Sequence, residues 1–516
     1  MGRSTSTTSP AASRPDLLLA ASRPDLLPAA SLADRFLLHW RAAPSRPVLR
    51  DVDGRWLSAS ELDQRSGAAA LRLCGAGLSP GDRLAICASS CADWVIAYVA
   101  ALRAGLVLVP INPAYTESEV TGIAADAQPA AALVDDPDRG GWLARGAGRL
   151  IPVAGLDAAL CPGAGKATDT PRSAARVSPS ATTDIDHASL EDPAVLLYTS
   201  GTTGAPKGAA LSHGNLLASA TAVGIAWDWT MEDRLLLTLP LFHMHGLGVG
   251  VNGALAAGAQ LVLRPGFDAA DVAQHAGAGI SMFFGVPAIY QRLLAVGALG
   301  ALAPLRLVVS GSAPLPAALA REIERATGTL PLERYGMTET VMLTANPLAG
   351  PRKPGRVGLP LPGVELRLAE DGEVQVRGPN VFRGYHGRPE ATAEVFAQDG
   401  WFRTGDLGEL DDDGHLKLVG RSKELIITGG FNVHPREVEE VLADFPGVRE
   451  VAVIGRPSEQ WGEAVTAVVV CEGRIDPAAL RAHAAQTLAG YKVPKTVEFL
   501  DALPRNALGK VIRGDL

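Results

Sequence analysis

Short apolar runs alternate with helix-like segments along much of this chain, and this rhythm constrains the fold more than any other feature. The first part of the pattern reads strand, helix, strand, helix, strand, at Arg83–Cys87, Asp93–Arg103, Leu106–Pro110, from about Thr116, and at Ala131–Val134. The alternation resumes from 195 to about 320, after a stretch from about 137 to 190 whose Gly, Pro, Asp and Ser content predicts mainly loops. Strands that alternate with helices form parallel sheets covered on both faces, so the pattern predicts an α/β fold.

The predicted pattern of secondary structure changes twice after this region. Short strands separated by turn residues, at 364–368, 373–377 and 415–419, predict a small β-rich subdomain. A compact tail that mixes strands and helices follows Gly420-Arg421-Ser422-Lys423.

We therefore expect three parts in the chain. They are an extension over 1–31, a large N-terminal domain over 32–419 and a small α+β C-terminal domain over 420–516. The extension is low in complexity and contains the octapeptide Ala-Ala-Ser-Arg-Pro-Asp-Leu-Leu twice. Because two copies are too few for a stacked repeat, we predict that the extension is disordered or weakly helical.

The composition argues against several classes of protein. A formal net charge of −8 argues against a nucleic-acid-binding protein, which would show a basic face. No apolar run reaches the roughly 18 residues that a membrane-spanning helix needs, and the polar start of the chain does not resemble a signal peptide. The 5 cysteines are few and unevenly spaced, as in a reducing compartment. We expect a cytoplasmic protein, either monomeric or dimeric.

A loop of hydroxyl residues and glycines interrupts one of the apolar runs and ends in a lysine. From Leu196 to Gly208 the sequence reads Leu-Leu-Tyr-Thr-Ser-Gly-Thr-Thr-Gly-Ala-Pro-Lys-Gly. Glycines let main-chain N–H groups approach an anion, hydroxyls add donors, and Lys207 adds a positive charge. The spacing differs from the common P-loop, in which Ser or Thr follows the lysine directly. We interpret the loop as a polyphosphate-binding site rather than a flexible linker.

Further motifs suggest a nucleotide site, although each is weak alone. The segment from Glu333 to Thr340 combines a tyrosine that can stack on a base with oxygen ligands suited to Mg²⁺. Asp406 follows a glycine turn and can accept both hydroxyls of a ribose, Arg421 is a cation at the domain junction, and Lys510 lies in a Gly-Lys turn. Taken singly, these residues would be read as a capping threonine, a turn aspartate and surface charges.

The order and spacing of these motifs resemble the adenylate-forming superfamily, which includes acyl-CoA synthetases, peptide-synthetase adenylation domains and luciferases. The resemblance runs from about residue 32 to residue 516 and is closest to malonyl-CoA synthetases. It implies an N-terminal domain of two parallel-type sheets layered with helices plus the small β-rich subdomain, joined through a hinge to the C-terminal domain. It also implies that ATP and Mg²⁺ activate a carboxylic acid as acyl-AMP with release of pyrophosphate, after which CoA takes the acyl group.

The resemblance assigns a role to each motif residue. ATP and AMP would be bound by Thr199, Ser200, Gly201, Thr202, Thr203, Gly204, Lys207, Gly311, Ser312, Ala313, Glu333, Arg334, Tyr335, Gly336, Met337, Thr338, Asp406 and Arg421. Catalysis would involve Lys510, Thr338, Glu339 and His243, and Mg²⁺ would be held by Thr202 and Glu339. Rotation about Lys423 would then withdraw Lys510 and bring in the CoA-binding residues Gly429, Gly430 and Phe431.

The acid is indicated by Arg292, at the end of Gly-Val-Pro-Ala-Ile-Tyr-Gln-Arg. It matches the arginine with which malonyl-CoA synthetases hold the second carboxylate, and the resemblance adds His245, Ser312 and Met337 to the acid-binding set. We expect Arg292 to be buried and to hold that carboxylate through two parallel hydrogen bonds. The alternative is an arginine on a helix surface. Leu343 stands where the family often has asparagine, which leaves methylmalonate open.

Two other activities stay open at this point. The first is ligation of a medium-chain or aromatic acid, which an apolar pocket with Arg292 pointing outward would favour. The second is a stand-alone adenylation module that loads a carrier protein. The Gly429–Phe431 segment resembles the lining of the CoA tunnel and favours free CoA over a carrier protein.

Overall fold

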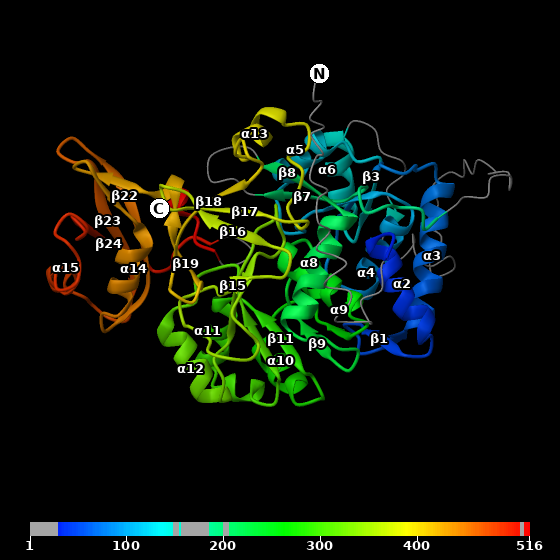
Figure 1. The fold of residues 1–516 in the computed structure, drawn as a ribbon, viewed down its shortest axis with the longest axis horizontal. Helices are drawn as coiled ribbons and strands as arrows, with labels where there is room; N and C mark the ends of the chain where they lie inside the picture. The colour runs from blue at the N-terminus through cyan, green and yellow to red at the C-terminus, as the bar shows by residue number, and fades with distance from the viewer. Residues whose placement is uncertain (1–28, 148–153, 156–184, 200–205, 506–509) are drawn as a thin grey trace, which may run out of the picture.

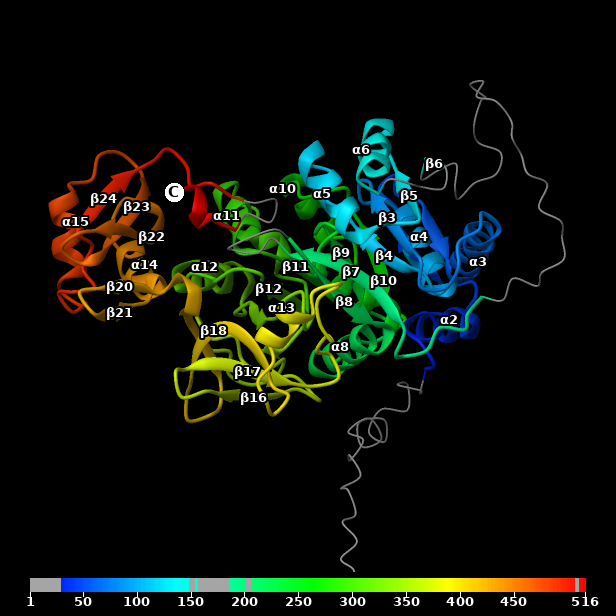
Figure 2. The same ribbon diagram turned by 90° about the horizontal axis from the view of Figure 1, so that it is seen from above.

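The computed structural model describes residues 29–147, 154–155, 185–199, 206–505 and 510–516. The chain forms a large unit and a smaller C-terminal unit beside it (Figures 1 and 2). The predicted α/β architecture, with a large N-terminal domain and a small C-terminal one, is confirmed. The extension predicted over 1–31 lies almost wholly outside the described residues, although Ser31 caps the first described helix, α2 (Leu32–Ala42).

The first sheet of the large unit has six strands in the order β6-β5-β3-β4-β7-β8. Its strands are β3 (Arg83–Cys87), β4 (Val107–Pro110), β5 (Ala131–Val134), β6 (Ala154–Gly155), β7 (Pro193–Thr199) and β8 (Lys207–Ser212). All neighbours are parallel except β7 and β8, which form an antiparallel hairpin. This hairpin brings the two ends of the predicted phosphate loop together.

The second sheet has nine strands in the order β15-β14-β13-β12-β11-β9-β10-β1-β2. Its strands are β1 (Pro47–Arg50), β2 (Trp56–Ser58), β9 (Arg234–Leu237), β10 (Gln260–Leu263), β11 (Met282–Gly285), β12 (Leu307–Ser310), β13 (Leu332–Tyr335), β14 (Thr344–Ala345) and β15 (Leu359–Pro360). The strands from β1 through β13 along this order are parallel, and antiparallel strands lie at both edges.

Helices cover and connect the two sheets (Figure 2). They are α3 (Ala59–Gly75), α4 (Ala92–Arg103), α5 (Glu117–Ala127), α6 (Pro137–Ala147), α8 (His213–Ala226), η1 (a π-helix, His245–Val251), α9 (Asn252–Ala256), α10 (Ala269–Ala276), α11 (Pro287–Ala295), η2 (Leu299–Leu302) and α12 (Ala317–Thr327). Helix α4 is apolar on every side and buried along its length, as a helix between two layers must be. The Tyr98 hydroxyl on α4 donates to Asn252 at 2.9 Å and so links the layers.

An antiparallel sheet of four strands, with α13 (Pro389–Glu394) between two of them, completes the large unit. Its strands are β16 (Glu365–Leu368), β17 (Glu373–Arg377), β18 (Phe402–Leu410) and β19 (Leu416–Arg421). A short 3₁₀ turn, η3 (Ser422–Glu424), contains the exposed Lys423 and leads into the C-terminal unit. The predicted boundary at 420 therefore falls just inside β19.

The C-terminal unit is a five-stranded sheet with two helices and a short terminal turn. Its elements are β20 (Ile426–Thr428), β21 (Phe431–Val433), α14 (Pro435–Ala443), β22 (Val448–Ser458), β23 (Gly462–Cys471), α15 (Pro477–Ala484), β24 (Thr496–Phe499) and η4 (Arg513–Asp515). Both helices pack their apolar residues on one face of the sheet, whereas the C-terminal residues Val511 and Leu516 pack with a second cluster.

One expectation about secondary structure is wrong. Residues 137–147 form helix α6, although their glycines favour a loop. The helix forms because Pro137 occupies its first turn, where proline is tolerated, and because Leu143 packs with Ile123 and Ala124 of α5. Within the described residues, no helix is long and apolar enough to cross a membrane.

Candidate active site

The predicted phosphate loop connects the ends of the β7–β8 hairpin. Thr199 pairs with Lys207 across the hairpin, and the Thr199 hydroxyl donates to the carbonyl oxygen of Lys207 at 3.4 Å. Ser200, Gly201, Thr202, Thr203 and Gly204 lie outside the described residues. The two described ends fix where the loop leaves the sheet and where it returns.

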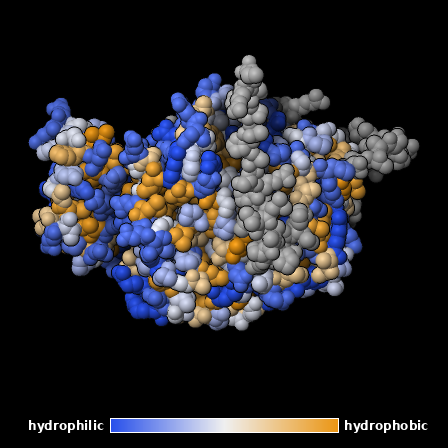
Figure 3. Space-filling view, in the orientation of Figure 1, coloured by the Kyte–Doolittle hydropathy of each residue, from blue (hydrophilic) through white to orange (hydrophobic). Residues whose placement is uncertain are grey.

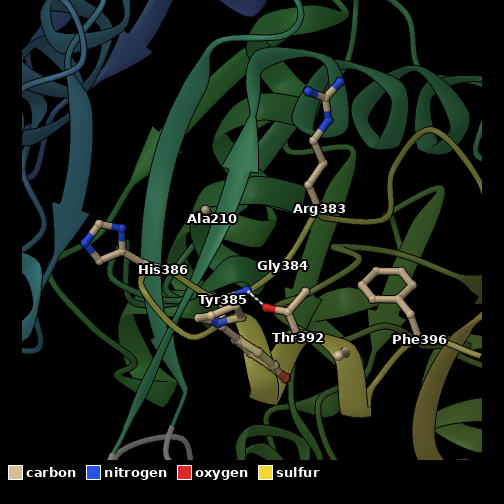
Figure 4. Close-up of a pocket in the computed structure, with 9 residues that line it drawn as sticks. Ala210, Arg383, Gly384, Tyr385, His386, Thr392 and Phe396 are labelled. Atoms are coloured by element: carbon tan, nitrogen blue, oxygen red, sulfur yellow. Dashed lines mark hydrogen bonds between the residues drawn. The ribbon is translucent and has the colours of Figure 1, made fainter.

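A tyrosine links Lys207 to one of the predicted metal ligands. The Tyr385 hydroxyl donates to Oε1 of Glu339 at 2.8 Å, and the Lys207 ammonium lies 5.3 Å from the centre of the Tyr385 ring. Tyr385 lies in the wall of a shallow depression, where its N–H donates to Thr392 at 2.9 Å and Phe396 lies nearby (Figure 4). None of the predicted site residues that the structure describes lines that depression.

The predicted base and ribose residues meet at the ends of three strands. The Tyr335 hydroxyl at the end of β13 donates to Oδ2 of Asp406 at 2.5 Å, and Nε of Arg421 lies 3.0 Å from Oδ1 of the same carboxylate. Asp406 and Arg421 are paired across β18 and β19, which explains how residues separated in sequence come together. Burial and the charge of Asp406 raise the pKa of Tyr335 well above its usual value, so this hydroxyl remains a donor.

The predicted catalytic lysine lies beside this pair. Burial lowers the pKa of Lys510 below its usual 10.5 and the charge of Arg421 lowers it further, whereas Glu424 and Asp406 raise it. The ammonium group is therefore within electrostatic range of all three side chains. The structure brings Lys510, from the C-terminal unit, together with Asp406 and Arg421 of the large unit.

The predicted acid-binding residues Ser312 and His245 form a polar chain with Arg334. Nη2 of Arg334 donates to Oγ of Ser312 at 3.2 Å, and the same Oγ lies 3.2 Å from Nδ1 of His245. Burial, and then the charge of Arg334, lower the pKa of His245 well below its usual value. The ring is therefore neutral, and Nδ1 either accepts a hydrogen bond from the serine hydroxyl or donates one to its oxygen, according to the tautomer. Nε2 has no hydrogen-bond partner among the described residues.

Arg334 is a buried cation that pairs with no acidic side chain among the described residues. Its side chain is 5% exposed, and burial lowers its pKa to about 9. In the described part of the chain, Nε lacks a hydrogen-bond partner and no carboxylate forms an ion pair with this guanidinium. Gly311 allows the close approach, because a Cβ there would lie 2.3 Å from Nε. Since an unpaired buried charge is costly, the arrangement fits a ligand that brings negative charge.

The expectation that Arg292 is buried is wrong. Helix α11 buries Ile289, Tyr290 and Leu293, and Arg292 lies on its exposed side. Its guanidinium lies over the ring of Phe267, 4.7 Å from the ring centre. This cation–π contact holds the side chain at the surface, away from the chain of Arg334, Ser312 and His245.

Other predicted positions lie around the same strand ends. Gly311 is buried and Ala313 half-buried after β12, and Gly336, Met337 and Thr338 are half-buried in the turn after β13. Glu333 is on the opposite face of β13 from Arg334, accepts a hydrogen bond from the N–H of Gly355 at 2.9 Å, and has a pKa raised to about 7 by burial. Burial lowers the pKa of His243 to about 4, so this ring is neutral.

The predicted CoA residues form the turn between β20 and β21. Thr428 pairs with Phe431, and the two turn residues Gly429 and Gly430 have φ angles of 58° and 83°. A two-residue turn with positive φ at both positions strongly favours glycine. Figure 2 shows this hairpin and the C-terminus at separate places in the C-terminal unit.

Aromatic side chains surround this turn. Phe431 is 55% exposed and stacks on Tyr491, with ring centres 4.6 Å apart. Trp461 lies beside Gly429, and the Lys495 ammonium is 5.3 Å from the Trp461 ring centre. The C-terminal unit thus exposes apolar residues among hydrophilic ones, as its visible face also shows (Figure 3).

The sequence signature of AMP-binding enzymes matches residues 37–386, and the signature of their C-terminal domain matches residues 437–510. The chain belongs to the AMP-binding enzyme family. It is 38% identical to a feruloyl-CoA synthase of Amycolatopsis sp over 92% of this chain and 96% of that protein. It is 35% identical to the mitochondrial malonate–CoA ligase of Mus musculus over 86% of this chain and 83% of that protein.

The fold matches solved structures of this family. The ATP-bound MatB from Rhodopseudomonas palustris superposes with a TM-score of 0.87 at 38% identity, covering 95% of this chain and 98% of that one. The o-succinylbenzoate CoA synthetase of Bacillus subtilis, in complex with its acyl-adenylate, has a TM-score of 0.81 at 28% identity and covers 93% and 97%. This AMP-binding enzyme is an ATP-dependent acid–CoA ligase that forms AMP.

Sequence reasoning missed one feature of this AMP-binding enzyme and did not single out the burial of another. Tyr385, which holds Glu339, follows a glycine in Arg-Gly-Tyr-His, and only its aromatic character could have drawn notice. Arg334 is among the predicted nucleotide-binding residues, and it contacts Ser312, which is predicted for both the nucleotide and the acid. The available signal for the burial of Arg334 was its place in a short strand that is buried at every position.

Proposed function

We propose that this AMP-binding enzyme ligates a small dicarboxylate, most simply malonate, to CoA through an acyl-adenylate. Arg334 carries the proposal, because it is a buried guanidinium with no acidic partner among the described residues. It takes over the role first expected for Arg292. The similarity to malonate–CoA ligases supports this choice of acid.

The second carboxylate of malonate would supply the missing counter-ion. A guanidinium can hold a carboxylate through two parallel hydrogen bonds, and a charged hydrogen bond contributes about 1.5–3 kcal/mol. Acetate or an apolar acid would leave Arg334 unpaired. Succinate differs by one methylene, which a pocket discriminates by only about 1–3 kcal/mol, and methylmalonate adds a single methyl group. Both are therefore expected as weaker substrates.

The nucleotide residues would stabilise the charge that develops during adenylation. The attack joins a carboxylate to a triphosphate, so positive groups placed at the reacting atoms supply most of the rate. Lys207 and the phosphate loop would hold the departing pyrophosphate, and Asp406, fixed by Tyr335 and Arg421, would hold the ribose. Lys510 would bridge the attacking carboxylate and the α-phosphate.

Mg²⁺ fits the position of Glu339. This carboxylate is buried, burial raises its pKa, and Tyr385 orients it through Oε1. Carboxylate oxygens are ligands that Mg²⁺ prefers, so Glu339 would hold the ion together with Thr202 of the loop. When bound, the ion would neutralise phosphate charge and make pyrophosphate a better leaving group.

Free CoA is the proposed acyl acceptor, in preference to a carrier protein. The Gly429–Gly430 turn presents backbone without side chains to a slim pantetheine arm. The exposed ring of Phe431, with Trp461 and Lys495 nearby, offers stacking surfaces and positive charge for the nucleotide end of CoA. Rotation about Lys423 would bring this hairpin to the site after adenylation.

The acid is tested by measuring AMP release that depends on both ATP and CoA. The panel is acetate, malonate, methylmalonate, succinate, octanoate, coumarate and ferulate. We expect the highest kcat/KM with malonate or methylmalonate, since only a diacid pairs with Arg334. Higher kcat/KM with ferulate or octanoate would overturn the dicarboxylate proposal while leaving the ligase activity intact.

An aromatic acid is the second candidate, and one observation favours it. Arg292 points outward over Phe267, as expected for a ligase of apolar acids, and the feruloyl-CoA synthase is among the similar proteins. Phe284, stacked on His245 with ring centres 6.2 Å apart, could then contact an aromatic acid. The same panel separates the two candidates.

As pH rises, the rate of adenylation is expected to fall earlier than it would if Lys510 had the pKa of an ordinary lysine. Lys510 acts as a cation, and its pKa lies below 10.5 because of burial and Arg421. The rate should therefore fall as pH rises through that lowered pKa. The check is the rate of acyl-adenylate formation against pH, with Lys510→Arg for comparison. The arginine of this variant stays protonated, so the part of the alkaline fall that is due to Lys510 should vanish, and only the loss of charge on Arg334, whose pKa burial lowers to about 9, should remain. An identical fall in both proteins would refute the assignment.

A further inference from the structure

The segment that carries Lys510 is anchored by an arginine three residues further on. Nη2 of Arg513 lies 2.5 Å from Oε1 of Glu439 on α14, and Nη1 lies 3.6 Å from Oε2 of Glu424 in η3. All three side chains are largely shielded from solvent, with Arg513 24% exposed. An ion pair in such a position is screened less than one at the surface.

Glu439 provides a fixed support for Arg513. Its Oε1 also accepts a hydrogen bond from the N–H of Val453 at 2.7 Å, on the edge strand β22. Burial raises the pKa of Glu439, while Arg513 and the Val453 N–H lower it. The carboxylate is thus tied to the sheet on one side and to Arg513 on the other.

Glu424 connects the same arginine to the hinge. It follows Lys423 directly, and its charge acts on both Lys510 and Arg421. Arg513 therefore spans the distance from the sheet of the C-terminal unit to the turn about which that unit is proposed to rotate.

Other contacts fix the backbone of the segment that carries Lys510 without the side chain of Arg513. Ile512 donates its N–H to the carbonyl of Pro504 at 2.9 Å, and Arg505 pairs with Val511 as an isolated bridge. At the far end, Nη1 of Arg456 donates to the carbonyl of Leu516 at 2.9 Å. The first two contacts join the two arms of the segment to each other, the third ties its end to β22, and none of them involves the hinge.

We infer that Arg513, given the role proposed above for Lys510, is a positioning residue that orients the Lys510 segment for adenylation through Glu439 and Glu424. Arg513 does not touch the reacting atoms. It sets the lysine where the carboxylate meets the α-phosphate, and this contact is not needed once the hairpin with Phe431 has replaced Lys510.

The test compares the two half-reactions in Arg513→Met. Acyl-adenylate formation is expected to fall about 10- to 100-fold, as for a small misplacement of a catalytic group. Thioester formation from supplied acyl-adenylate and CoA should stay at the wild-type rate. Glu424→Gln should show the same selective loss, and Arg513→Lys should recover part of it. Arg456→Met, which frees the end of the segment but not the hinge contact, should leave both half-reactions unchanged.

A second readout separates positioning from mere folding. Arg513 lowers the pKa of Lys510, as does Arg421, while Glu424 and Asp406 raise it. Removing Arg513 should therefore move the alkaline fall of adenylation to higher pH. Equal loss of both half-reactions, or unchanged adenylation, would overturn the role of Arg513. If Lys510→Ala also leaves adenylation intact, the proposed role of Lys510 fails as well, whereas a Lys510 defect without an Arg513 defect refutes only this inference.

Discussion

Lys510→Ala is expected to lower the rate of acyl-adenylate formation by about 10²- to 10³-fold, the usual effect of removing a group that stabilises transition-state charge. The ammonium group lies among Arg421, Glu424 and Asp406, where the acid and the α-phosphate would meet. The measurement is acid-dependent exchange of pyrophosphate into ATP, which requires adenylation but not CoA.

The second half-reaction is the internal control for this variant. Supplied acyl-adenylate should react with CoA at the wild-type rate, because Lys510 is proposed to leave the site before CoA attacks. Loss of both half-reactions with an unchanged melting temperature would contradict the proposal that Lys510 serves adenylation and the Gly429–Phe431 turn serves the transfer to CoA.

Arg334→Met is expected to reduce kcat/KM for malonate roughly 10- to 150-fold, the equivalent of one lost charged hydrogen bond. The values for acetate and for longer monocarboxylates should fall less or rise, since the unpaired cation is gone. Steady-state kinetics with the same panel of acids measure the change in selectivity.

Arg292→Met is the matched control, because it removes the same functional group from the exposed side of α11. Its malonate kinetics should resemble those of the wild type. The melting temperature of Arg334→Met should be unchanged or higher, since an apolar side chain replaces a buried charge that no carboxylate in the described residues neutralises. A malonate defect in Arg292→Met and none in Arg334→Met would return the carboxylate clamp to Arg292.

Much of the fold could be predicted because its local signals agree with its packing. The strands at 83–87 and 131–134 are continuous apolar runs, which is what a parallel sheet covered on both faces requires. Thr116 begins α5 with a capping box to Glu119, a signal that can be read from the sequence. Helix α6 could not be predicted, because it depends on packing against α5 rather than on helix propensity.

Part of the candidate site could also be predicted from the sequence, and part could not. The resemblance carried by the motifs predicted that Asp406, Arg421 and Lys510 share one site. In the structure, the β18–β19 hairpin pairs Asp406 with Arg421, and Lys510 is within electrostatic range of both. The choice between Arg292 and Arg334 could not be made from spacing. Which arginine is buried depends on how α11 packs and on the room that Gly311 leaves beside β13, and neither is a local property of the sequence.

The two faces of strand β13 limit how the acid selectivity of this enzyme can change, in evolution or by design. Consecutive residues of the strand serve different partners, since Arg334 contacts Ser312 on one face and Tyr335 contacts Asp406 on the other. A one-residue insertion or deletion would exchange these faces and lose acid and nucleotide contacts together. Point substitutions at 334 or 312, where the acid is proposed to bind, would instead alter the acid while leaving the contact between Tyr335 and Asp406 in place. New acid selectivities should therefore arise by substitution in this strand, with its length unchanged.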